Sequence, residues 1–299
     1  MPRRASPTPQ PPTTTVRGRE FSFNLLSGQA GGPVMERILI TGAAGQIGSW
    51  LRQSLRRPER HLRLLDIAVQ AEVGVDEDAD LIVASITDED ALRKACEDVD
   101  VVLHLGGLST GGFTWEQYLD VNINGTFKVF EAARRAGVAR VVFASSNHAV
   151  GFHPANLGEN VADYAFPRPD SFYGVSKVAG ESIGSLFHDR YGLEVLCLRI
   201  GSFRTRPTDE RALWNWLSPD DCTRLFEAAL ATPEPGYRVV WGVSANSQRV
   251  MSLQEANGIG YFPLDNAQDY AEEITRTTTP AQSGAERLIG GAFTAPDFE

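Results

Sequence analysis

Short apolar runs alternate with amphipathic helical patterns from Met35 onward, and this alternation constrains the fold more than any other feature of the sequence. Strands are predicted at 37–41, 62–66, 81–84, 101–105, 140–145 and 194–200, and helices at 46–55, 88–96, 114–136 and 173–191. Apolar runs that are bounded by turns and separated by helices are typical of a parallel sheet covered on both faces. The sequence therefore predicts a doubly wound α/β fold, with a small carboxyl-terminal portion that binds substrate.

The first 34 residues differ in composition from the rest of the chain. They contain many prolines, a threonine run at 13–15, and four arginines against one glutamate. Such a segment cannot bury a packed core, so we expect a disordered extension over 1–34 and one domain over 35–299. An organelle transit peptide is one interpretation of this leader. The other is an upstream start or a dispensable tail, because Met35 stands directly before the first strand.

Net charge and cysteine content exclude several classes of function. Acidic residues outnumber basic ones by 38 to 28, and the formal charge of −10 disfavours nucleic-acid binding. No run approaches the ~20 apolar residues of a membrane-spanning helix. The cysteines Cys96, Cys197 and Cys222 are spaced too widely for a disulfide framework or a zinc-binding pair. We therefore expect a cytoplasmic protein that holds no metal and acts on a small molecule.

A glycine-rich loop follows the first predicted strand and opens the first predicted helix. Gly42 permits a tight turn, Gly45 lets the backbone approach a pyrophosphate, and Gly48 allows the helix to pack closely on the sheet. The helix N-terminus offers N–H groups to the phosphates. Asp66, at the end of the second strand, can accept hydrogen bonds from the ribose hydroxyls and repel a 2′-phosphate. The pattern predicts a dinucleotide site of the Rossmann type that favours NAD over NADP, unless Asp66 is an ordinary strand-end acid.

A Tyr-x-x-x-Lys pattern lies on the predicted helix 173–191. Tyr173 and Lys177 share one helical face, so the ammonium is expected to lower the pKa of the phenol and make it a general base. Ser146 lies just past the fifth strand, at the sheet edge where ligands bind, and can hold a substrate oxygen beside the phenol. Ser145 is the competing serine, although strand alternation points it into the core. We predict that Ser146, Tyr173 and Lys177 are the catalytic residues.

These motifs resemble those of extended short-chain dehydrogenases, which carry the Gly-x-x-Gly-x-x-Gly spacing. The strings HLGGLS (104–109), FASSNHAVGF (143–152), YGVSK (173–177), RIGS (199–202) and VVWGVSAN (239–246) further resemble the uronate dehydrogenase family. That family oxidises C1 of a pyranose uronic acid such as glucuronate or galacturonate to an aldarolactone and passes the hydride to NAD. The resemblance implies the same reaction here, with Tyr173 as the base and Lys177 on the nicotinamide ribose.

The resemblance also implies two sets of binding residues. The substrate contacts would be Ser109, Ser146, Asn147, His148, Ser202 and Arg211. The cofactor contacts would be Gly42, Gly45, Gln46, Ile47, Gly48, Asp66, Ser85, Ile86, Leu105, Gly106, Gly107, Tyr173, Lys177 and Ile200. Ser85 departs from the family, which usually has an aspartate there to accept the adenine amino group, so weaker NAD binding is expected.

Three arginines crowd the predicted loop after the sixth strand. A planar guanidinium pairs bidentately with a carboxylate, the group that distinguishes a uronate from its parent sugar. We predict that Arg211 binds this carboxylate, whereas Arg204 and Arg206 are interpreted as solvated loop residues. His148 is expected to orient the substrate, not to catalyse. The substrate loops are expected mainly at 201–218 and 242–265.

Two alternatives remain open from the sequence. One is a sugar-nucleotide epimerase or dehydratase of the same fold, although such enzymes need a larger carboxyl-terminal portion than this chain leaves after its sixth strand. The other is a catalytically silent dinucleotide sensor, although such proteins lack the Tyr or the Lys. Residues 266–274 predict one acidic helix, and 278–299 a loosely packed tail or an arm for oligomer contacts. The partners expected are a uronic acid and further copies of the chain in a homo-oligomer.

Overall fold

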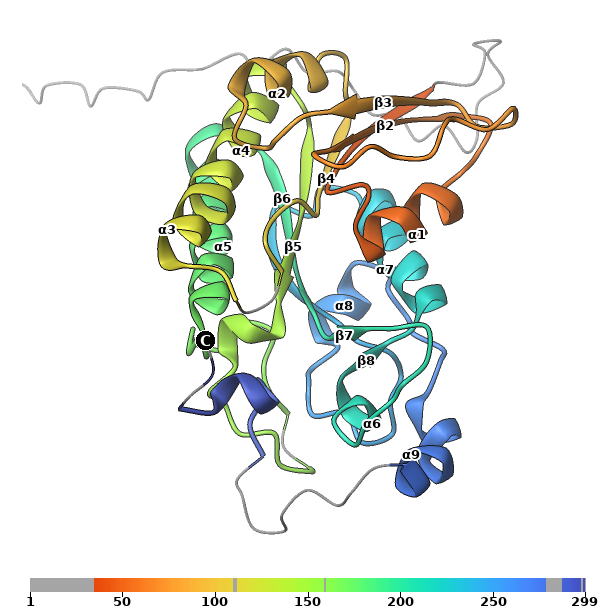
Figure 1. Cartoon of the computed structure of the whole chain (residues 1–299), viewed down its shortest axis with the longest axis vertical. Coiled ribbons are helices and arrows are strands. Elements are labelled where there is room, and N and C mark those ends of the chain that lie inside the picture. The colour runs from red at the N-terminus through yellow and green to blue at the C-terminus, as the bar shows by residue number, and fades with distance from the viewer. Residues whose placement is uncertain (1–34, 110–111, 159, 278–286, 297, 299) are drawn as a thin grey trace, which may run out of the picture. The chain divides into compact units, whose positions relative to one another are not determined.

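Seven parallel strands form the central sheet in a computed structural model, which describes residues 35–109, 112–158, 160–277, 287–296 and 298 (Figure 1). Across the sheet the order is β3-β2-β1-β4-β5-β6-β9, and every neighbouring pair is parallel. The strands are β1 (Glu36–Thr41), β2 (Arg60–Asp66), β3 (Ala79–Val83), β4 (Val101–His104), β5 (Arg140–Ser146), β6 (Glu194–Ile200) and β9 (Tyr237–Gly242). The predicted doubly wound α/β fold is confirmed, and its strand order reverses between β1 and β4, where such sheets bind ligands.

Helices cover both faces of this sheet (Figure 1). One face carries α1 (Gln46–Ser54) and α7 (Pro219–Ala231), and the other carries α2 (Glu89–Ala95), α4 (Gly125–Ala136) and α5 (Phe172–Tyr191). Each helical layer has its own buried apolar cluster against the strands, and the two clusters include Leu51 of α1 and Phe130 of α4 respectively. Because successive strand residues face opposite sides of the sheet, Ile38 and Leu39 of β1 belong to different clusters.

Shorter elements complete the described chain. They are α3 (Trp115–Gln117), the π-helix η1 (Tyr118–Asn124), η2 (Asn147–Val150), β7 (Ser202–Phe203), α6 (Ala212–Asn215), β8 (Trp216–Leu217), α8 (Gln254–Gly258), η3 (Ala267–Tyr270), α9 (Ala271–Thr277) and η4 (Gly291–Thr294). The strands β7 and β8 pair in a small separate sheet. The predicted acidic helix at 266–274 corresponds to η3 and α9.

The structure differs from the prediction in three respects. Both α7 and β9 were missed, although Ser218 caps α7 by accepting from the N–H of Asp221 and although β9 is largely buried. The predicted helix 114–136 is interrupted by η1, where a π turn shifts the register of the inward-facing side chains.

The third difference concerns the carboxyl terminus. Residues 287–296 are not a loose tail, because Ile289 is fully buried and its N–H donates to the carbonyl of His153 at 2.9 Å. The N–H of Ala155 donates to the carbonyl of Arg287 at 2.6 Å. The expected loose packing is therefore wrong for the described part, while 278–286 and the extension 1–34 lie outside the described residues.

Candidate active site

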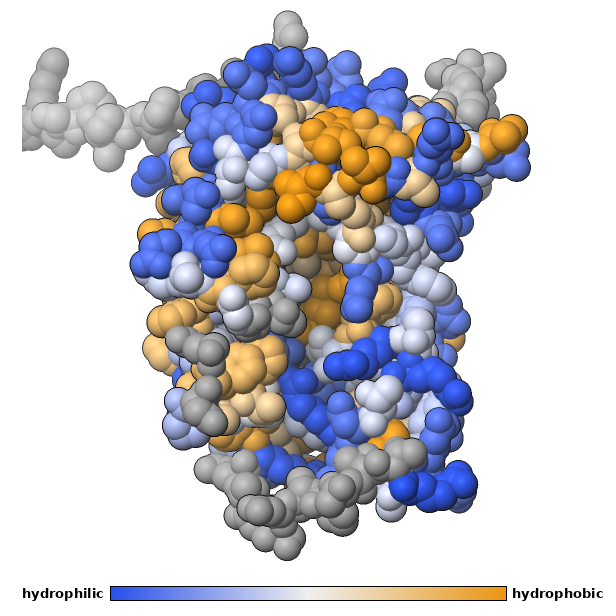
Figure 2. All heavy atoms as spheres, in the orientation of Figure 1, coloured by the Kyte–Doolittle hydropathy of each residue, from blue (hydrophilic) through white to orange (hydrophobic). Residues whose placement is uncertain are grey.

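A cavity of about 720 Å³ opens at the carboxyl edge of the sheet, and the face shown in Figure 2 is visibly hollowed, with apolar residues inside the hollow. The loop between β1 and α1, the ends of β2 to β6 and the start of α5 all contribute to its wall. All fourteen residues predicted to contact the cofactor line this cavity. The structure thus brings together, in one concave site, residues that are spread from position 42 to position 200.

The glycine loop tolerates no Cβ at its two ends. Gly42 has a φ of +72°, and a Cβ there would lie 2.7 Å from the backbone nitrogen of Gly106. A Cβ on Gly48 would lie 2.4 Å from the carbonyl oxygen of Gly42. No side chain caps the N-terminus of α1, so the first N–H groups of this helix can meet phosphate oxygens. This is the cradle that a dinucleotide pyrophosphate requires, and the residues present fit it.

Two polar side chains lie at the ends of β2 and β3. The carboxylate of Asp66 accepts from the N–H groups of Ala44 and Ala68, both at 2.9 Å. The hydroxyl of Ser85 accepts from the N–H of Thr87 at 3.1 Å and lies 2.8 Å from the hydroxyl oxygen of the same threonine. Asp66 is therefore fixed at the cavity wall, whereas the Ser85 hydroxyl is engaged within its own turn.

The predicted catalytic residues meet at the bottom of the cavity. Ser146 ends β5, and Tyr173 and Lys177 lie in the first two turns of α5, whose N-cap is Ser171. The ammonium of Lys177 lies 5.4 Å from the centroid of the Tyr173 ring and donates to the carbonyl of Ala144 at 2.8 Å. This carbonyl and the helical register fix the ammonium beside the phenol.

Burial controls the ionisation of this pair. It raises the pKa of Tyr173 to about 12, although a hydrogen bond with Ser146 acts in the opposite direction. It lowers the pKa of Lys177 to about 8, opposed by the charge of Glu181. The expected lowering of the phenol pKa is therefore wrong for the protein alone, because desolvation dominates. Ser145 points into the core as expected and donates to Glu181 at 2.6 Å.

Asn122, a residue that the sequence analysis missed, braces the cavity wall. Its amide oxygen accepts from the N–H of Leu108 at 2.7 Å, and its nitrogen donates to the Leu108 carbonyl and the Ser176 hydroxyl, both at 2.9 Å. It therefore ties the loop after β4 to α5. Asn122 lies in the π-helix η1, and π turns often occur at functional sites, but no period in the sequence signals one.

Arg211 carries a buried charge that pairs with no carboxylate among the described residues. Its Nη1 donates to the hydroxyl of Ser202 at 3.2 Å and its Nη2 to the carbonyl of Ile289 at 2.8 Å. Its Nε is buried without a partner, and burial lowers the pKa of the guanidinium. The amide nitrogen of Asn147 donates to the same Ile289 carbonyl at 3.3 Å. Two donors from distant parts of the chain thus converge on one oxygen atom.

The substrate residues are only partly gathered by the cavity. Ser109 and Ser146 line it, whereas Asn147, His148, Ser202 and Arg211 lie outside its lining. The C-terminal segment 287–296 lies against this second group, since Ile289 accepts from two of its members and Phe293 stacks on His148 with ring centroids 4.0 Å apart. That segment is a further part of the site that the sequence analysis missed.

The remaining loop predictions have mixed outcomes. Arg204 and Arg206 are exposed, as interpreted, and Arg206 lies 3.4 Å from a carboxylate oxygen of Glu273. Gly201 and Phe203 of the first predicted substrate loop line the cavity, but no residue of 242–265 does.

Within the described ranges, no helix could cross a membrane and no cluster of His, Cys, Asp and Glu could hold a metal ion.

The sequence profile of the NAD-dependent epimerase/dehydratase family matches residues 38–211 of the 299. The chain belongs to this family. The matched part runs from β1 to the start of α6 and includes the glycine loop, Asp66, and the Tyr173 and Lys177 pair. NAD is thereby confirmed as the cofactor.

Several individual proteins are similar to the chain over most of its length. The uronate dehydrogenase of Pseudomonas syringae pv. tomato is 42% identical over 260 residues, which are 87% of this chain and 93% of that protein. The L-arabinose 1-dehydrogenase (NAD(P)(+)) of Haloferax volcanii is 37% identical over 261 residues, 80% of this chain and 100% of that one. A solved mutant of Agrobacterium tumefaciens uronate dehydrogenase, complexed with NAD, is similar with a TM-score of 0.82 at 37% identity, covering 87% of this chain and 97% of that one. The resemblance to uronate dehydrogenases is confirmed.

Proposed function

We propose that the protein oxidises C1 of a pyranose uronic acid, glucuronate or galacturonate, to the aldarolactone with NAD as the hydride acceptor. The observation that carries this proposal is the site around Arg211, where a buried guanidinium and the Asn147 amide converge on one oxygen and a hydroxyl lies beside them. A carboxylate offers the same type of acceptor with a negative charge, and charge-assisted bonds are the stronger ones. The similarity to uronate dehydrogenases supports the same reading.

The proposal gives the site residues the following roles. Arg211, Asn147 and Ser202 bind the sugar carboxylate, and Ser109 and His148 contact hydroxyls. Ser146 holds the C1 oxygen, and Tyr173 takes the proton of the C1 hydroxyl as the C1–H bond gives its hydride to the nicotinamide. Loss of the hydroxyl proton at O1 and of the hydride at C1 converts the hemiacetal to the lactone, so atoms and charges balance. NAD, when bound, supplies the hydride acceptor.

Different parts of the chain hold the different parts of the dinucleotide. The glycine loop and the start of α1 receive the pyrophosphate, Asp66 accepts from the ribose hydroxyls of the adenosine, and Lys177 donates to the nicotinamide ribose. Because Asp66 is held in place by two N–H groups, its charge stays at the position where a 2′-phosphate would bind. We therefore expect faster turnover with NAD than with NADP.

Replacement of Arg211 tests the substrate class. R211A should lower kcat/KM for glucuronate roughly tenfold to a hundredfold, mainly through KM, because a charge-assisted pair contributes ~1.5–3 kcal/mol. R211K should recover only part of this loss, since lysine keeps the charge without the planar fork. The exposed Arg204 provides the matched control, and R204A should behave as the unchanged protein. The measurement is NADH formation with glucuronate, galacturonate, glucose and L-arabinose.

The outcomes separate the alternatives. Unchanged uronate kinetics in R211A would mean that another group binds the carboxylate. Preference for L-arabinose or glucose over both uronates would assign the chain to sugar oxidation without carboxylate recognition. Turnover of a nucleoside-diphosphate sugar without net NADH formation would instead favour the epimerase alternative.

Replacement of Tyr173 tests the base. Y173F keeps the ring and its packing but removes the hydroxyl, and loss of a general base lowers the rate on the order of 10²–10⁴-fold. Tyr164 is exposed and lies outside the cavity lining, so Y164F is the matched control and should keep full activity. If Y173F retained most of its kcat, the proton would be taken by a different group.

A further inference from the structure

A buried aspartate stands directly behind His148. The Oδ2 atom of Asp170 lies 2.7 Å from Nδ1 of His148, and none of the Asp170 side chain is exposed. We infer that Asp170 is a positioning residue that keeps the proton of His148 on Nδ1 and thereby presents Nε2 to the sugar as a hydrogen-bond acceptor. This inference rests on the proposed function, in which His148 contacts the substrate.

The surroundings of Asp170 are shaped for a carboxylate at this point. A Cβ on Gly151 would lie 1.8 Å from Oδ2, and a Cβ on Gly290 would lie 1.9 Å from the same atom. The N–H of Gly290 donates to the carbonyl of Gly151 at 2.9 Å, which holds the two glycines against each other. Two segments far apart in the sequence thus leave room for one side chain, and a larger residue at either glycine would displace it.

Ser171 fixes which carboxylate oxygen faces the imidazole. Its hydroxyl accepts from the N–H of Gly174 at 3.1 Å as the N-cap of α5, and it donates its own proton to Oδ1 of Asp170 at 2.9 Å. Oδ2 is then the oxygen that meets His148. Because an ionised carboxylate can only accept, Nδ1 must be the donor in this bond.

The imidazole is also held on its other sides. The ring of Phe293 stacks on it with centroids 4.0 Å apart and an interplanar angle of 32°, and the ring of Tyr173 meets it edge-on at 5.8 Å. The backbone N–H of His148 donates to the Ser146 hydroxyl at 3.2 Å. The ring therefore lies beside the proposed base and the proposed C1 contact, with Nε2 as the nitrogen left for a ligand. In a carboxylate–histidine pair of this kind, the carboxylate sets the tautomer.

The variant D170N is a test of this arrangement because it preserves shape. The Ser171 hydroxyl still needs an acceptor, so the amide oxygen should take the place of Oδ1 and the amide NH₂ should face His148. That geometry forces Nδ1 to accept and moves the imidazole proton to Nε2. In the Asp–His pair of a catalytic triad, replacing Asp by Asn likewise imposes the wrong tautomer on the imidazole.

The decisive measurement is the ¹⁵N NMR spectrum of the histidine rings in the full-length protein. In the unchanged protein His148 should show a protonated Nδ1 and a bare Nε2, and in D170N the reverse. The signals of the His148 ring are those that disappear in H148Q. The chain has only five histidines, so the missing signals are easy to identify. A protonated Nε2 in the unchanged protein, or an unchanged tautomer in D170N, would overturn the inference. The measurement on the unchanged protein does not depend on the folding of any variant.

Kinetics provide the second measurement. D170N should raise the KM for glucuronate roughly twofold to tenfold, since one hydrogen bond contributes ~0.5–1.5 kcal/mol, and should leave the KM for NAD unchanged. In the H148Q background the same change should have no further effect on KM, whereas a purely structural role would add to it. Asp163 is also buried, but its carboxylate accepts from the N–H of Glu255 and does not meet His148, so D163N is the matched control and should keep both KM values. Equal changes in D170N and D163N would contradict the positioning role.

If the protein turned over no uronate at all, the proposed function would fail while the NMR reading of the tautomer would still stand. If uronates were turned over but the tautomer were reversed, the positioning role alone would fail.

Discussion

The two titratable side chains at the bottom of the cavity are both held toward their uncharged forms. Burial raises the pKa of the Tyr173 phenol to about 12 and lowers that of the Lys177 ammonium to about 8. With so high a pKa the phenol is protonated at neutral pH, so Tyr173 can take the proton of the C1 hydroxyl only after it has lost its own. Lys177 therefore contributes to function at the expense of stability.

This trade-off predicts that K177M is more stable than the unchanged protein at neutral pH while losing activity. A folded-state pKa of about 8 against an unfolded value of 10.5 means that the buried ammonium costs about 3 kcal/mol below pH 8. Because the unfolded chain binds the proton between these values and the folded protein does not, the penalty disappears as pH rises toward 10.5. Urea unfolding of both proteins at several pH values measures the difference.

The difference in unfolding free energy between K177M and the unchanged protein should shrink steadily from pH 8 to pH 10. Above pH 10 the raised pKa of Tyr173 starts to contribute, so the comparison ends there. Lys128 is exposed enough to serve as the control, since its side chain has 26% of its surface accessible, and K128M should show no such trend. A constant difference across the range would mean that Lys177 is not desolvated in the fold.

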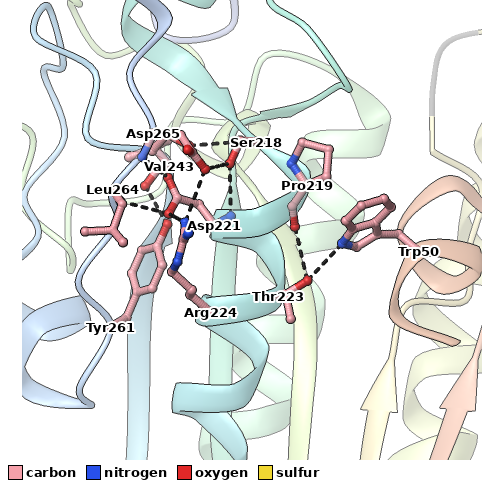
Figure 3. Close-up of polar contacts among 11 residues, drawn as sticks. Trp50, Ser218, Pro219, Asp221, Thr223, Arg224, Val243, Tyr261, Leu264 and Asp265 are labelled. Carbon is pink, nitrogen blue, oxygen red and sulfur yellow. Dashed lines mark hydrogen bonds and ion pairs between the residues drawn. The ribbon is translucent and has the colours of Figure 1, made fainter. Parts of the chain in front are cut away.

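Among the elements, α7 and the loop after α8 are locked together by one carboxylate (Figure 3). Asp221, fully buried in α7, accepts from the N–H of Leu264 at 2.8 Å and from that of Asp265 at 3.0 Å, and it pairs with Arg224. Ser218 caps the helix and donates to the carboxylate of Asp265. This network fixes the end of the predicted substrate loop 242–265 to the helix that covers the sheet.

D221A should lower the unfolding free energy by about 2–4 kcal/mol, because it leaves the N–H groups of Leu264 and Asp265 without their acceptor and removes one of the two carboxylates that pair with Arg224. Thr223 provides the control on the same helix. Its hydroxyl accepts from Trp50 at 2.9 Å and donates to the carbonyl of Pro219 at 3.2 Å, and T223A removes these two neutral bonds, for an expected loss of about 1–2 kcal/mol. Urea denaturation compares the two variants. Equal losses would show that the loop finds other partners or water in place of Asp221.

Elements with a strong local pattern were predictable, and those defined by their surroundings were not. The six predicted strands carry apolar runs between turn residues and occur within a few positions of where they were expected. The π turn η1 has no signature of its own, since it shifts the register inside an otherwise helical pattern. Residues 287–296 carry no clear period, and their order comes from contacts with Gly151 and His153.

At the level of the whole protein, the same reasoning explains why the sequence predicts the cofactor half of the candidate site better than the substrate half. Every predicted cofactor residue lines the cavity, because parallel strands bring their carboxyl ends to one edge whatever lies elsewhere in the chain. The substrate half is completed by contacts that no local pattern encodes. Asn147 meets the carbonyl of Ile289 across 142 positions of sequence, and the Asp170 pair is enclosed by glycines 139 positions apart, at 151 and 290.

The first residues of β1 are held by contacts within the domain, which makes a prediction for the extension 1–34. The N–H of Glu36 donates to the carbonyl of Glu59 at 2.8 Å, and the N–H of Arg37 donates to Asp100 at 2.8 Å. A chain shortened to begin at Met35 should therefore keep the Tm and the kcat/KM of the full chain.

The measurement is sensitive enough to detect a modest contribution from the extension, because losing 1 kcal/mol lowers the Tm of a domain of this size by about 2–4 °C. A chain shortened further, to begin at Leu39, is the control. It lacks the first three residues of β1 and their ladder to β2, and it should lose stability clearly. If the chain beginning at Met35 also lost stability, the apolar residues Phe21, Phe23, Leu25 and Leu26 would have to pack on the domain, and the extension would belong to the folded unit.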